Sequence, residues 1–529
     1  MNLDTSLLPV GPRLIDTLTE ERGGVDYLNL RQVNLDLMVA CIPGQNNVTS
    51  NVRSYSVMCW IYWKIFEETE RRKKRNTSTE EIRVFREKVE SYFLWGHLQN
   101  QVGGVAGTRS RPPNNGRGKV SLQFADWKRS ADNTSIQAAV RYGPSLTELG
   151  LLEKSAPGVY HVTETGEALA AALDQQLRKS TAYDKLSDLS TDTGTLAEAE
   201  ALFPFWRSDR TSRPEQIAMQ AVLFDFQQID DIRSPMGRRS AFIYAITQVL
   251  QSNRSPLSLE EIRDGLAYRR TRKGGSIDLP PGPREVTDYW FILQSRQLQR
   301  IALEVAMGWM EEKMQGDDCA SIEDVVRAAT KLLTKPPKIQ DSSPLLALVR
   351  SSARLISTEQ EFFVAIDDDP ERHDLQSVAS CIVDLLGESF DEAFRESMRA
   401  LFLLSNCDAW LRSDSRYKDL ILRGGAMRIS LRYWSETVAK FQHAPISDFL
   451  RYFFESLIFS QHLAVATNRF DGESSRLRFT FGEEGLESLV DEPWRPGITF
   501  DHLYALLQLL VSSGVLMIDD KERYECVSG

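Results

Sequence analysis

Two clusters of basic side chains have the residue types and spacing to contact phosphate. Four cations, Arg269, Arg270, Arg272 and Lys273, stand directly before Gly274-Gly275. The loop at 103–119 contributes Arg109, Arg111, Arg117 and Lys119 and contains no acidic residue. Lysine and arginine form charge-assisted hydrogen bonds with phosphate oxygens, and such contacts position a protein on nucleic acid without reading its sequence. Both clusters are therefore candidates for backbone contact; the alternative is that each is a solvated face.

Catalytic and cofactor motifs do not accompany these cations. Gly118-Lys119 is followed by Val120, so it is no P-loop, and Gly-x-Ser-x-Gly is absent. No Gly-x-Gly-x-x-Gly follows a predicted strand, no two of the six histidines form an HExxH or HxH pair, and the six cysteines form no CxxC pair. His462 lies in an apolar helical stretch, which favours a satisfied core histidine over a base. The sequence thus indicates no catalytic residue, no metal site and no cofactor, and an enzyme is the minor alternative.

Composition limits the size and class of the protein. The chain has 529 residues, of which 42% are hydrophobic, and a formal net charge of −11. A single core stops growing at about 250–300 residues, so two or three domains are expected. The acidic balance argues against non-specific coating of nucleic acid but leaves room for a local basic face. Scattered cysteines, an N-terminus unlike a signal peptide and the lack of a ~20-residue apolar run predict a cytoplasmic protein without a membrane partner.

Helical periodicity dominates the chain. Residues 55–68 are apolar almost all round, which predicts a helix buried on most sides. Ser78 and Glu81 match a capping box at the start of an amphipathic helix over 79–100. Residues 286–312 carry an apolar stripe at helical spacing, typical of a core helix. We therefore predict a mainly α, multi-domain fold.

A compact pattern of helices and strands covers about 45 residues at 134–178. We expect a helix at 134–142, a break at Gly143-Pro144 and a second short helix at 145–149. A strand beginning at Leu151, a turn at Pro157-Gly158 and a return strand through Tyr160 and Val162 follow, and Thr163 caps a final helix. This order resembles the winged helix-turn-helix superfamily.

The resemblance implies a role for the helix before the hairpin, which in that superfamily usually enters the major groove. Here that helix, at 144–150, offers only Ser145, Thr147 and Glu148 as polar groups. Lys128, Arg129 and Arg141 lie just upstream and add positive charge. The resemblance therefore implies the fold of the hairpin more strongly than it implies that the helix at 144–150 contacts bases in the major groove of DNA.

The chain end, 476–527, resembles the same superfamily more weakly. We expect an edge strand at 476–481, a helix from Glu483, a helix at 500–511, and two strands at 514–518 and 523–527. Asp519 and Asp520 make the turn between the last strands acidic, which favours packing or partner contact over DNA binding.

Two stretches suggest domain boundaries. Residues 180–197 are rich in Ser, Thr and Asp, and residues 335–344 contain Pro-Pro and Asp-Ser-Ser-Pro. They predict a helical N-terminal domain at 1–180 ending in a winged helix, a helical middle domain at 198–334, and a helical C-terminal domain at 345–529 with a second winged-helix-like module.

Two function classes remain. The first is a non-catalytic DNA-binding or scaffolding subunit of a larger assembly, with DNA and other subunits as partners. The order of the elements resembles that of accessory subunits in bacterial multi-gene systems, including those that defend against phage and plasmids. The second is a protein-interaction adaptor that touches no nucleic acid, favoured by the net charge of −11 and the acidic C-terminal turn.

Overall fold

The computed structural model describes residues 26–46, 49–71, 78–105, 110–128, 138–156, 159–315, 320–334, 339–340, 342–470, 476–482 and 485–527. The fold is mainly helical, with 64% helix and 7% strand, which confirms the predicted fold class. All strands of the described residues form two-stranded antiparallel sheets. Within those same residues, every helix is too short or too polar to cross a membrane.

The chain divides into two compact units, each built from separate stretches of sequence. Unit 1 comprises Met1–Met38 and Thr287–Thr499, and unit 2 comprises Val39–Val286 and Phe500–Gly529. This division differs from the three consecutive domains that the sequence predicted at 1–180, 198–334 and 345–529. Helices α1 (Arg31–Cys41) and α11 (Pro281–Gln315) each contain a boundary between the units.

Helix α2 forms the centre of the first part of unit 2. It is buried along most of its length, as the all-round apolar pattern predicts, and packs against α5. The Ser78 and Glu81 capping box is present at the start of α3, and α3 packs against α7. The helices here are α2 (Val52–Arg71), α3 (Thr79–Gln99), α4 (Ala138–Glu148), α5 (Glu164–Leu177), α6 (Tyr183–Ser187), α7 (Leu196–Trp206), α8 (Arg213–Leu223) and the short η2 (Pro113–Gly116), η3 (Phe124–Asp126) and η4 (Phe226–Gln228).

The hairpin predicted after α4 is confirmed. Strand β2 (Leu152–Ala156) pairs with β3 (Val159–Val162), with Leu152 opposite Val162, and the Thr163 side chain caps α5. The predicted turn at Pro157-Gly158 lies outside the described residues. The break at Gly143-Pro144 is wrong, because α4 continues through Pro144 as one helix. Tertiary packing keeps the helix intact at Pro144, because the next two residues, Ser145 and Leu146, are buried.

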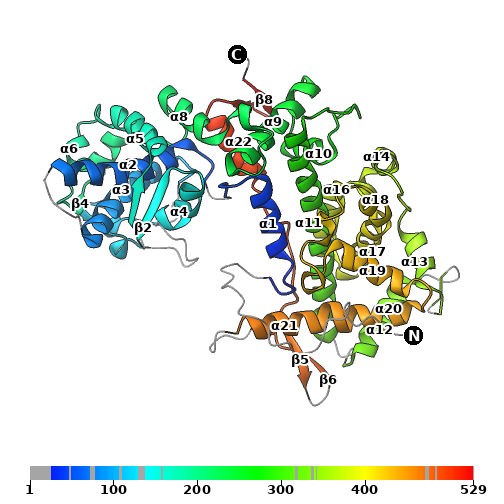
Figure 1. Cartoon of the computed structure of the whole chain (residues 1–529). Coiled ribbons are helices and arrows are strands. Elements are labelled where there is room, and N and C mark those ends of the chain that lie inside the picture. The colour runs from blue at the N-terminus through cyan, green and yellow to red at the C-terminus, as the bar shows by residue number, and fades with distance from the viewer. Residues whose placement is uncertain are drawn as a thin grey trace. The chain divides into compact units, whose positions relative to one another are not determined.

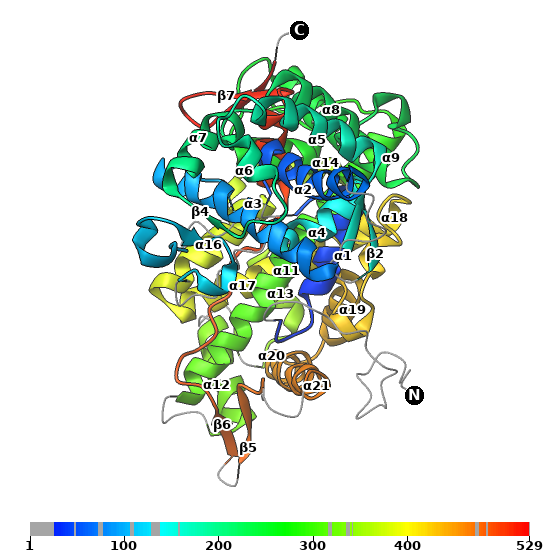
Figure 2. The same ribbon diagram turned by 90° about the vertical axis from the view of Figure 1, so that its left-hand side faces the viewer.

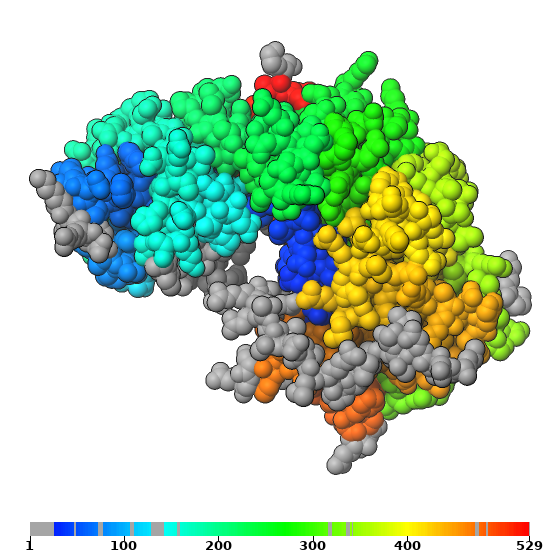
Figure 3. All heavy atoms as spheres, in the orientation of Figure 1, coloured from blue at the N-terminus to red at the C-terminus, as the bar shows by residue number. Residues whose placement is uncertain are grey.

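The C-terminal segment completes a module of unit 2 whose other half lies more than 200 residues earlier in the sequence (Figure 1). Helices α9 (Pro235–Asn253) and α10 (Leu259–Tyr268) pack with α22 (Leu503–Ser512) and the hairpin of β7 (Leu516–Ile518) and β8 (Tyr524–Cys526). Leu257 and Tyr524 exchange backbone hydrogen bonds of 3.0 and 2.8 Å. In Figure 3 the red C-terminal atoms lie against the green surface of this region.

The prediction of one module over 476–527 is therefore wrong. Residues up to Thr499 belong to unit 1, where β5 (Phe479–Gly482) pairs with β6 (Gly485–Ser488). They form a separate hairpin that follows α21 (Gln461–Asn468) in the chain, as Figure 2 shows. Strand β6 also replaces the helix expected from Glu483. Leu486 explains this choice, because its side chain is buried and its N–H donates to the Ala320 carbonyl.

Unit 1 is organised around α11, whose predicted apolar stripe is confirmed as core. Trp290 and Trp309 are fully buried, and Trp309 stacks on Phe394 with ring centroids 4.4 Å apart. The remaining elements are α12 (Ile322–Leu333), α13 (Leu345–Ser352), α14 (Glu359–Asp368), α15 (Pro370–His373), α16 (Leu375–Glu388), α17 (Phe390–Asn406), α18 (Asp408–Ser413), η5 (Leu420–Leu422), η6 (Ala426–Arg428), α19 (Leu431–Phe441), α20 (Ile446–Tyr452), the π-helical η7 (Phe453–Ser460) and α21 (Gln461–Asn468).

Candidate nucleic-acid interface

Residues 110–128, here called the basic loop, are anchored to α3 in unit 2. Ser91 donates to the Leu122 carbonyl at 2.8 Å, and the Glu87 carboxylate accepts from the Phe124 N–H at 3.0 Å. Strand β1 (Val120–Ser121) pairs with β4 (Thr193–Gly194) on the other side. The sequence indicated a basic loop at 103–119, and the part described from residue 110 onward is packed, with the backbone contacts given above.

Arg111 and Lys128 are brought together by the backbone of this loop. The Arg111 N–H donates to the Lys128 carbonyl at 2.9 Å, and the Lys128 N–H donates to the Arg111 carbonyl at 3.0 Å. Directly opposed antiparallel residues that exchange both hydrogen bonds have Cα atoms about 5.5 Å apart and side chains on the same face. Both side chains are exposed. The loop therefore presents two cations side by side from an isolated β-bridge.

Arg117 and Lys119 add two further exposed cations on either side of Gly118. The preceding turn is left-handed at Asn114, Asn115 and Gly116. Gly116 is required there, because a Cβ on it would lie 3.0 Å from the Trp95 ring at a φ of +74°. Arg111, Arg117, Lys119 and Lys128 form no ion pair with any residue whose structure is described.

Positive charge is concentrated in the unit that carries this loop. Unit 2 has 36 Lys and Arg against 34 Asp and Glu, a net charge of +2, whereas unit 1 has 27 against 40, a net charge of −13. Residues 109–129 alone hold six cations and one acid, Asp126. The acidic total of the chain thus conceals a local basic segment, and a local excess of positive charge attracts phosphate.

Three further predicted contact residues lie wholly or partly outside the described structure. Arg109 and Arg129 lie outside the described residues, and Arg141 lies in α4 where only the backbone is described. The polar groups of α4 itself are engaged in packing. Ser145 is within 2.8 Å of the Tyr55 hydroxyl, and the Glu148 carboxylate accepts from the Gly44 N–H at 3.0 Å. The exposed cations of the basic loop are therefore better placed for phosphate contact than α4.

The second basic cluster, Arg269, Arg270, Arg272 and Lys273, lies in a tight turn after α10. Arg269 ends α10 in the left-handed conformation, and the Arg270 Nε donates to the Gly274 carbonyl at 3.3 Å. Arg272 forms a 2.8 Å ion pair with Glu261. Lys273 is exposed. This cluster stays a candidate for phosphate contact. However, Glu261 neutralises the charge of Arg272, and the Arg270 side chain is hydrogen-bonded within the turn.

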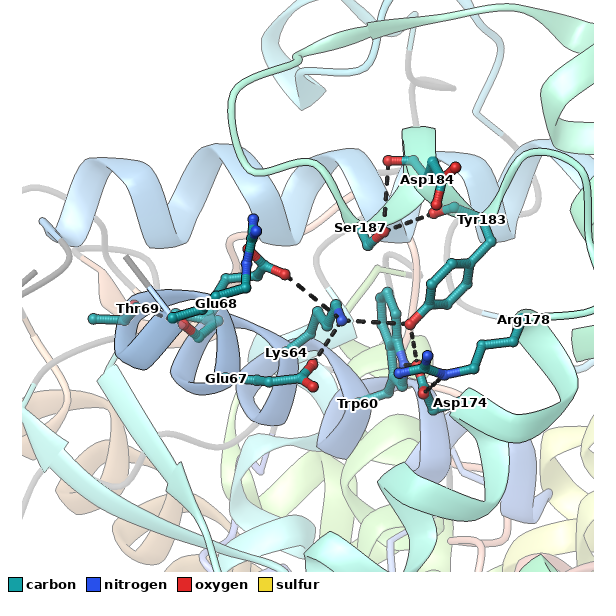
Figure 4. A network of polar contacts seen from close by, with 12 residues as sticks. Trp60, Lys64, Glu67, Glu68, Thr69, Asp174, Arg178, Tyr183, Asp184 and Ser187 are labelled. Atoms are coloured by element: carbon teal, nitrogen blue, oxygen red, sulfur yellow. Dashed lines mark hydrogen bonds and ion pairs between the residues drawn. The ribbon is translucent and has the colours of Figure 1, made fainter. Parts of the chain in front are cut away.

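A network of polar contacts joins α2, α5 and α6 inside unit 2 (Figure 4). Lys64 contacts Glu67 at 2.6 Å, the Tyr183 hydroxyl donates to Asp174 at 2.6 Å, and Trp60 donates to the same carboxylate at 2.9 Å. Burial and the hydrogen bond to Asp174 raise the pKa of Tyr183. Each of these groups is partnered by a neighbour in the network, so its evident role is to fix α6 on α2 and α5.

Residues 180–197, which the sequence predicted as a domain boundary, are packed inside unit 2. Tyr183 and the buried Leu186 fix α6 to the unit, and β4 pairs with β1. The ammonium of Lys88, itself buried, donates to the carbonyls of Lys185 and Asp188. Burial lowers the pKa of Lys88 to about 7. A composition rich in Ser, Thr and Asp resembled a linker, but a few anchoring side chains suffice to pack such a segment.

Two buried histidines, His97 and His462, are held neutral by the same pair of contacts, a backbone carbonyl at Nδ1 and a backbone N–H at Nε2. His97 lies against the Phe93 carbonyl through Nδ1 at 2.7 Å, and its Nε2 accepts from the Ser208 N–H at 2.9 Å. His462 lies 3.3 Å from the Tyr27 carbonyl through Nδ1 and accepts from the Arg478 N–H at 3.1 Å. Burial lowers the pKa of each to about 4. His462 is thus a satisfied core histidine, as predicted.

Acid should destabilise the fold through these two histidines. The folded-state pKa of each histidine lies near 4, below its ordinary value of 6.5. Its contribution to the free energy of unfolding is therefore fully present above pH 6.5 and is lost as pH falls towards 4. His97 lies in unit 2 and His462 in unit 1, and each adds up to about 1.4 kcal/mol per pH unit to the slope of its own unit. Chemical denaturation from pH 7 to 4.5 measures these slopes, and His97→Gln should flatten that of unit 2. An unchanged slope in that variant would contradict the assignment.

Comparison of the chain with protein-family models, curated proteins and solved structures found no match. Across the described ranges, no three His, Cys, Asp or Glu side chains gather in a way that would hold a metal ion. The candidate site therefore rests on the geometry and charge of the basic loop.

Proposed function

We propose that the chain is a non-catalytic subunit of a larger assembly that binds the sugar-phosphate backbone of DNA through the basic loop of unit 2. The observation that carries this proposal is the set of four exposed cations, Arg111, Arg117, Lys119 and Lys128, held on a packed backbone without carboxylate partners among the described residues. A preorganised set of cations loses less side-chain and loop entropy on binding than a disordered one. Its contacts are with phosphate and are independent of base sequence.

The neighbouring helices and hairpins support the same proposal. The order α4, β2, β3, α5 follows the basic loop in the sequence. It keeps the hairpin and the final helix of the winged helix-turn-helix resemblance, although α4 is one helix where the resemblance had two. The module of α9, α10, α22, β7 and β8 likewise packs three helices with an antiparallel hairpin. Its hairpin carries Asp520, Glu522 and Glu525. We assign it to contact with other subunits, because those carboxylates repel phosphate.

Neutralising the basic loop should abolish most DNA binding. We expect Arg111→Gln, Arg117→Gln, Lys119→Gln and Lys128→Gln together to weaken binding of a labelled random-sequence duplex by more than about tenfold. Each lost phosphate contact removes about 0.9 from the slope of log affinity against log salt, so the slope becomes shallower by about 3.6. Fluorescence anisotropy between about 50 and 200 mM salt gives both quantities.

A matched control removes the same charge from the other unit. Arg327, Lys331, Arg350 and Arg354 are exposed in unit 1, and their replacement by glutamine changes the net charge by the same amount. We expect this variant to bind as the wild type does. Equal losses in the two variants, or none in the basic-loop variant, would refute the proposed interface.

A protein-interaction adaptor is the second candidate function, favoured by the solvent side of the C-terminal hairpin. Met517 lies opposite Glu525, and Val527 pairs with Val515 one step further along the same face. Met517 and Val527 are exposed. Apolar side chains beside a carboxylate suit a protein surface better than a phosphate backbone. Failure of the wild-type protein to bind DNA even at low salt would favour this function.

A further inference from the structure

We infer that the basic loop selects double-stranded over single-stranded nucleic acid. The inference rests on the proposed function and adds the strandedness of the ligand. The aromatic side chains around the loop are all buried: Tyr92 is 1%, Trp95 3%, Phe124 2% and Trp127 3% exposed. Residues 98–123 contain no Phe, Trp or Tyr.

These rings are also committed to partners inside unit 2. Trp95 and Trp127 pack edge to face with centroids 6.2 Å apart, and the Trp127 Nε1 donates to the Ser121 carbonyl at 3.1 Å. The Tyr92 hydroxyl donates to Glu198 at 2.8 Å. Proteins that bind single strands without sequence preference combine a cationic groove with aromatic platforms on which the bases stack. Here the rings are buried beneath the loop, and the exposed charged side chains of the loop are the four cations and Asp126.

Cations without a stacking platform favour the ligand with the higher density of phosphate. Duplex DNA carries one charge per about 1.7 Å of axis, and each neutralised phosphate contributes about 0.9 to the salt slope, against about 0.7 for a single strand. Four contacts then give slopes of about 3.6 and 2.8. With equal affinities for the two ligands at 1 M salt, this difference in slope corresponds to about sixfold tighter binding of the duplex at 0.1 M salt.

The fixed geometry of the loop adds to this preference. Arg111 and Lys128 lie opposite each other in an isolated β-bridge with two backbone hydrogen bonds, so their spacing at the backbone is set before binding. A duplex presents its phosphates in an ordered row, whereas a single strand loses conformational entropy when its phosphates align with fixed cations. Both effects favour the duplex.

The test compares a duplex and an unstructured single strand of equal length and random sequence, each titrated into the full-length protein across a salt series. We expect the duplex to bind at least about sixfold more tightly at 0.1 M salt, with the steeper salt slope. Arg111→Gln with Lys128→Gln should reduce duplex affinity more than single-strand affinity. Equal or tighter binding of the single strand overturns this inference and leaves the proposed function standing. Binding of neither ligand overturns the proposed function as well.

Discussion

Removal of residues 500–529 should unfold the part of unit 2 that contains α9 and α10. Five leucines of α22 are completely buried in this module: Leu503, Leu506, Leu507, Leu509 and Leu510. Burial of each leucine contributes about 1.5–3 kcal/mol, so their combined loss exceeds about 7 kcal/mol, comparable to the whole stability of a typical domain. The truncation also leaves Arg263 without Asp501, its partner at 2.7 Å. We expect lost helicity and rapid proteolysis within 235–268.

Point variants make this prediction independent of the truncation. Leu506→Ala should cost about 2–5 kcal/mol, because it leaves a cavity in the module. Tyr504 lies on the same helix and is 54% exposed, so Tyr504→Ala should change stability by less than about 0.5 kcal/mol. Denaturation of both variants measures the difference. Equal stability of the two, together with a truncated protein that keeps its protease resistance, would show that α22 is dispensable.

Local signals in the sequence were sufficient for individual elements. The Ser78 and Glu81 pair predicts the start of α3 because both partners of a capping box lie within one turn. The spacing of Trp290 to Trp309 predicts one face of α11 for the same reason. Pro144 shows the limit of such signals. It normally breaks a helix, yet α4 continues through it because packing around Ser145 and Leu146 outweighs the local cost.

The arrangement of the units and of the candidate site depends on partners distant in sequence. Nothing near Tyr524 indicates that it pairs with Leu257, so the C-terminal module could not be assigned to α9 and α10 from sequence. Likewise, the cations of both basic clusters look alike in the sequence. Only the structure shows that Arg272 is paired with Glu261, whereas Arg111 and Lys128 are exposed side by side. Charge composition identifies candidates, and packing decides which of them are available.

A buried ion pair in unit 1 gives the second large expected effect. Glu311 on α11 is completely buried and accepts two hydrogen bonds from the Arg478 guanidinium, at 2.7 and 3.0 Å, and one from the Trp494 N–H at 2.6 Å. The guanidinium also lies 4.9 Å from the Tyr27 ring centroid. Burial raises the pKa of Glu311, and Arg478 opposes that rise. This pair thus joins segments that are far apart in the sequence.

Arg478→Met should destabilise unit 1 by about 3–5 kcal/mol at neutral pH, because it leaves the Glu311 carboxylate buried without its counter-charge. Arg327→Met is the matched control. Its 2.9 Å pair with Asp324 is exposed on the arginine side, so we expect a change of less than about 1 kcal/mol. Denaturation of both variants measures the two losses, and equal losses would contradict the role of burial.

Two further measurements separate lost charge from lost packing in Arg478→Met. Without Arg478 the folded-state pKa of Glu311 rises further. Ionisation of Glu311 therefore does not destabilise the variant below the ordinary pKa of 4.5, and it lowers the free energy of unfolding as pH rises above that value. The deficit relative to the wild type should therefore shrink as pH is lowered towards 4.5. Adding Glu311→Gln removes the buried charge and should recover a large part of the loss at neutral pH. If neither change restores stability, the destabilisation comes from the lost contacts with Tyr27 and Trp494, and the buried pair is not what holds these segments together.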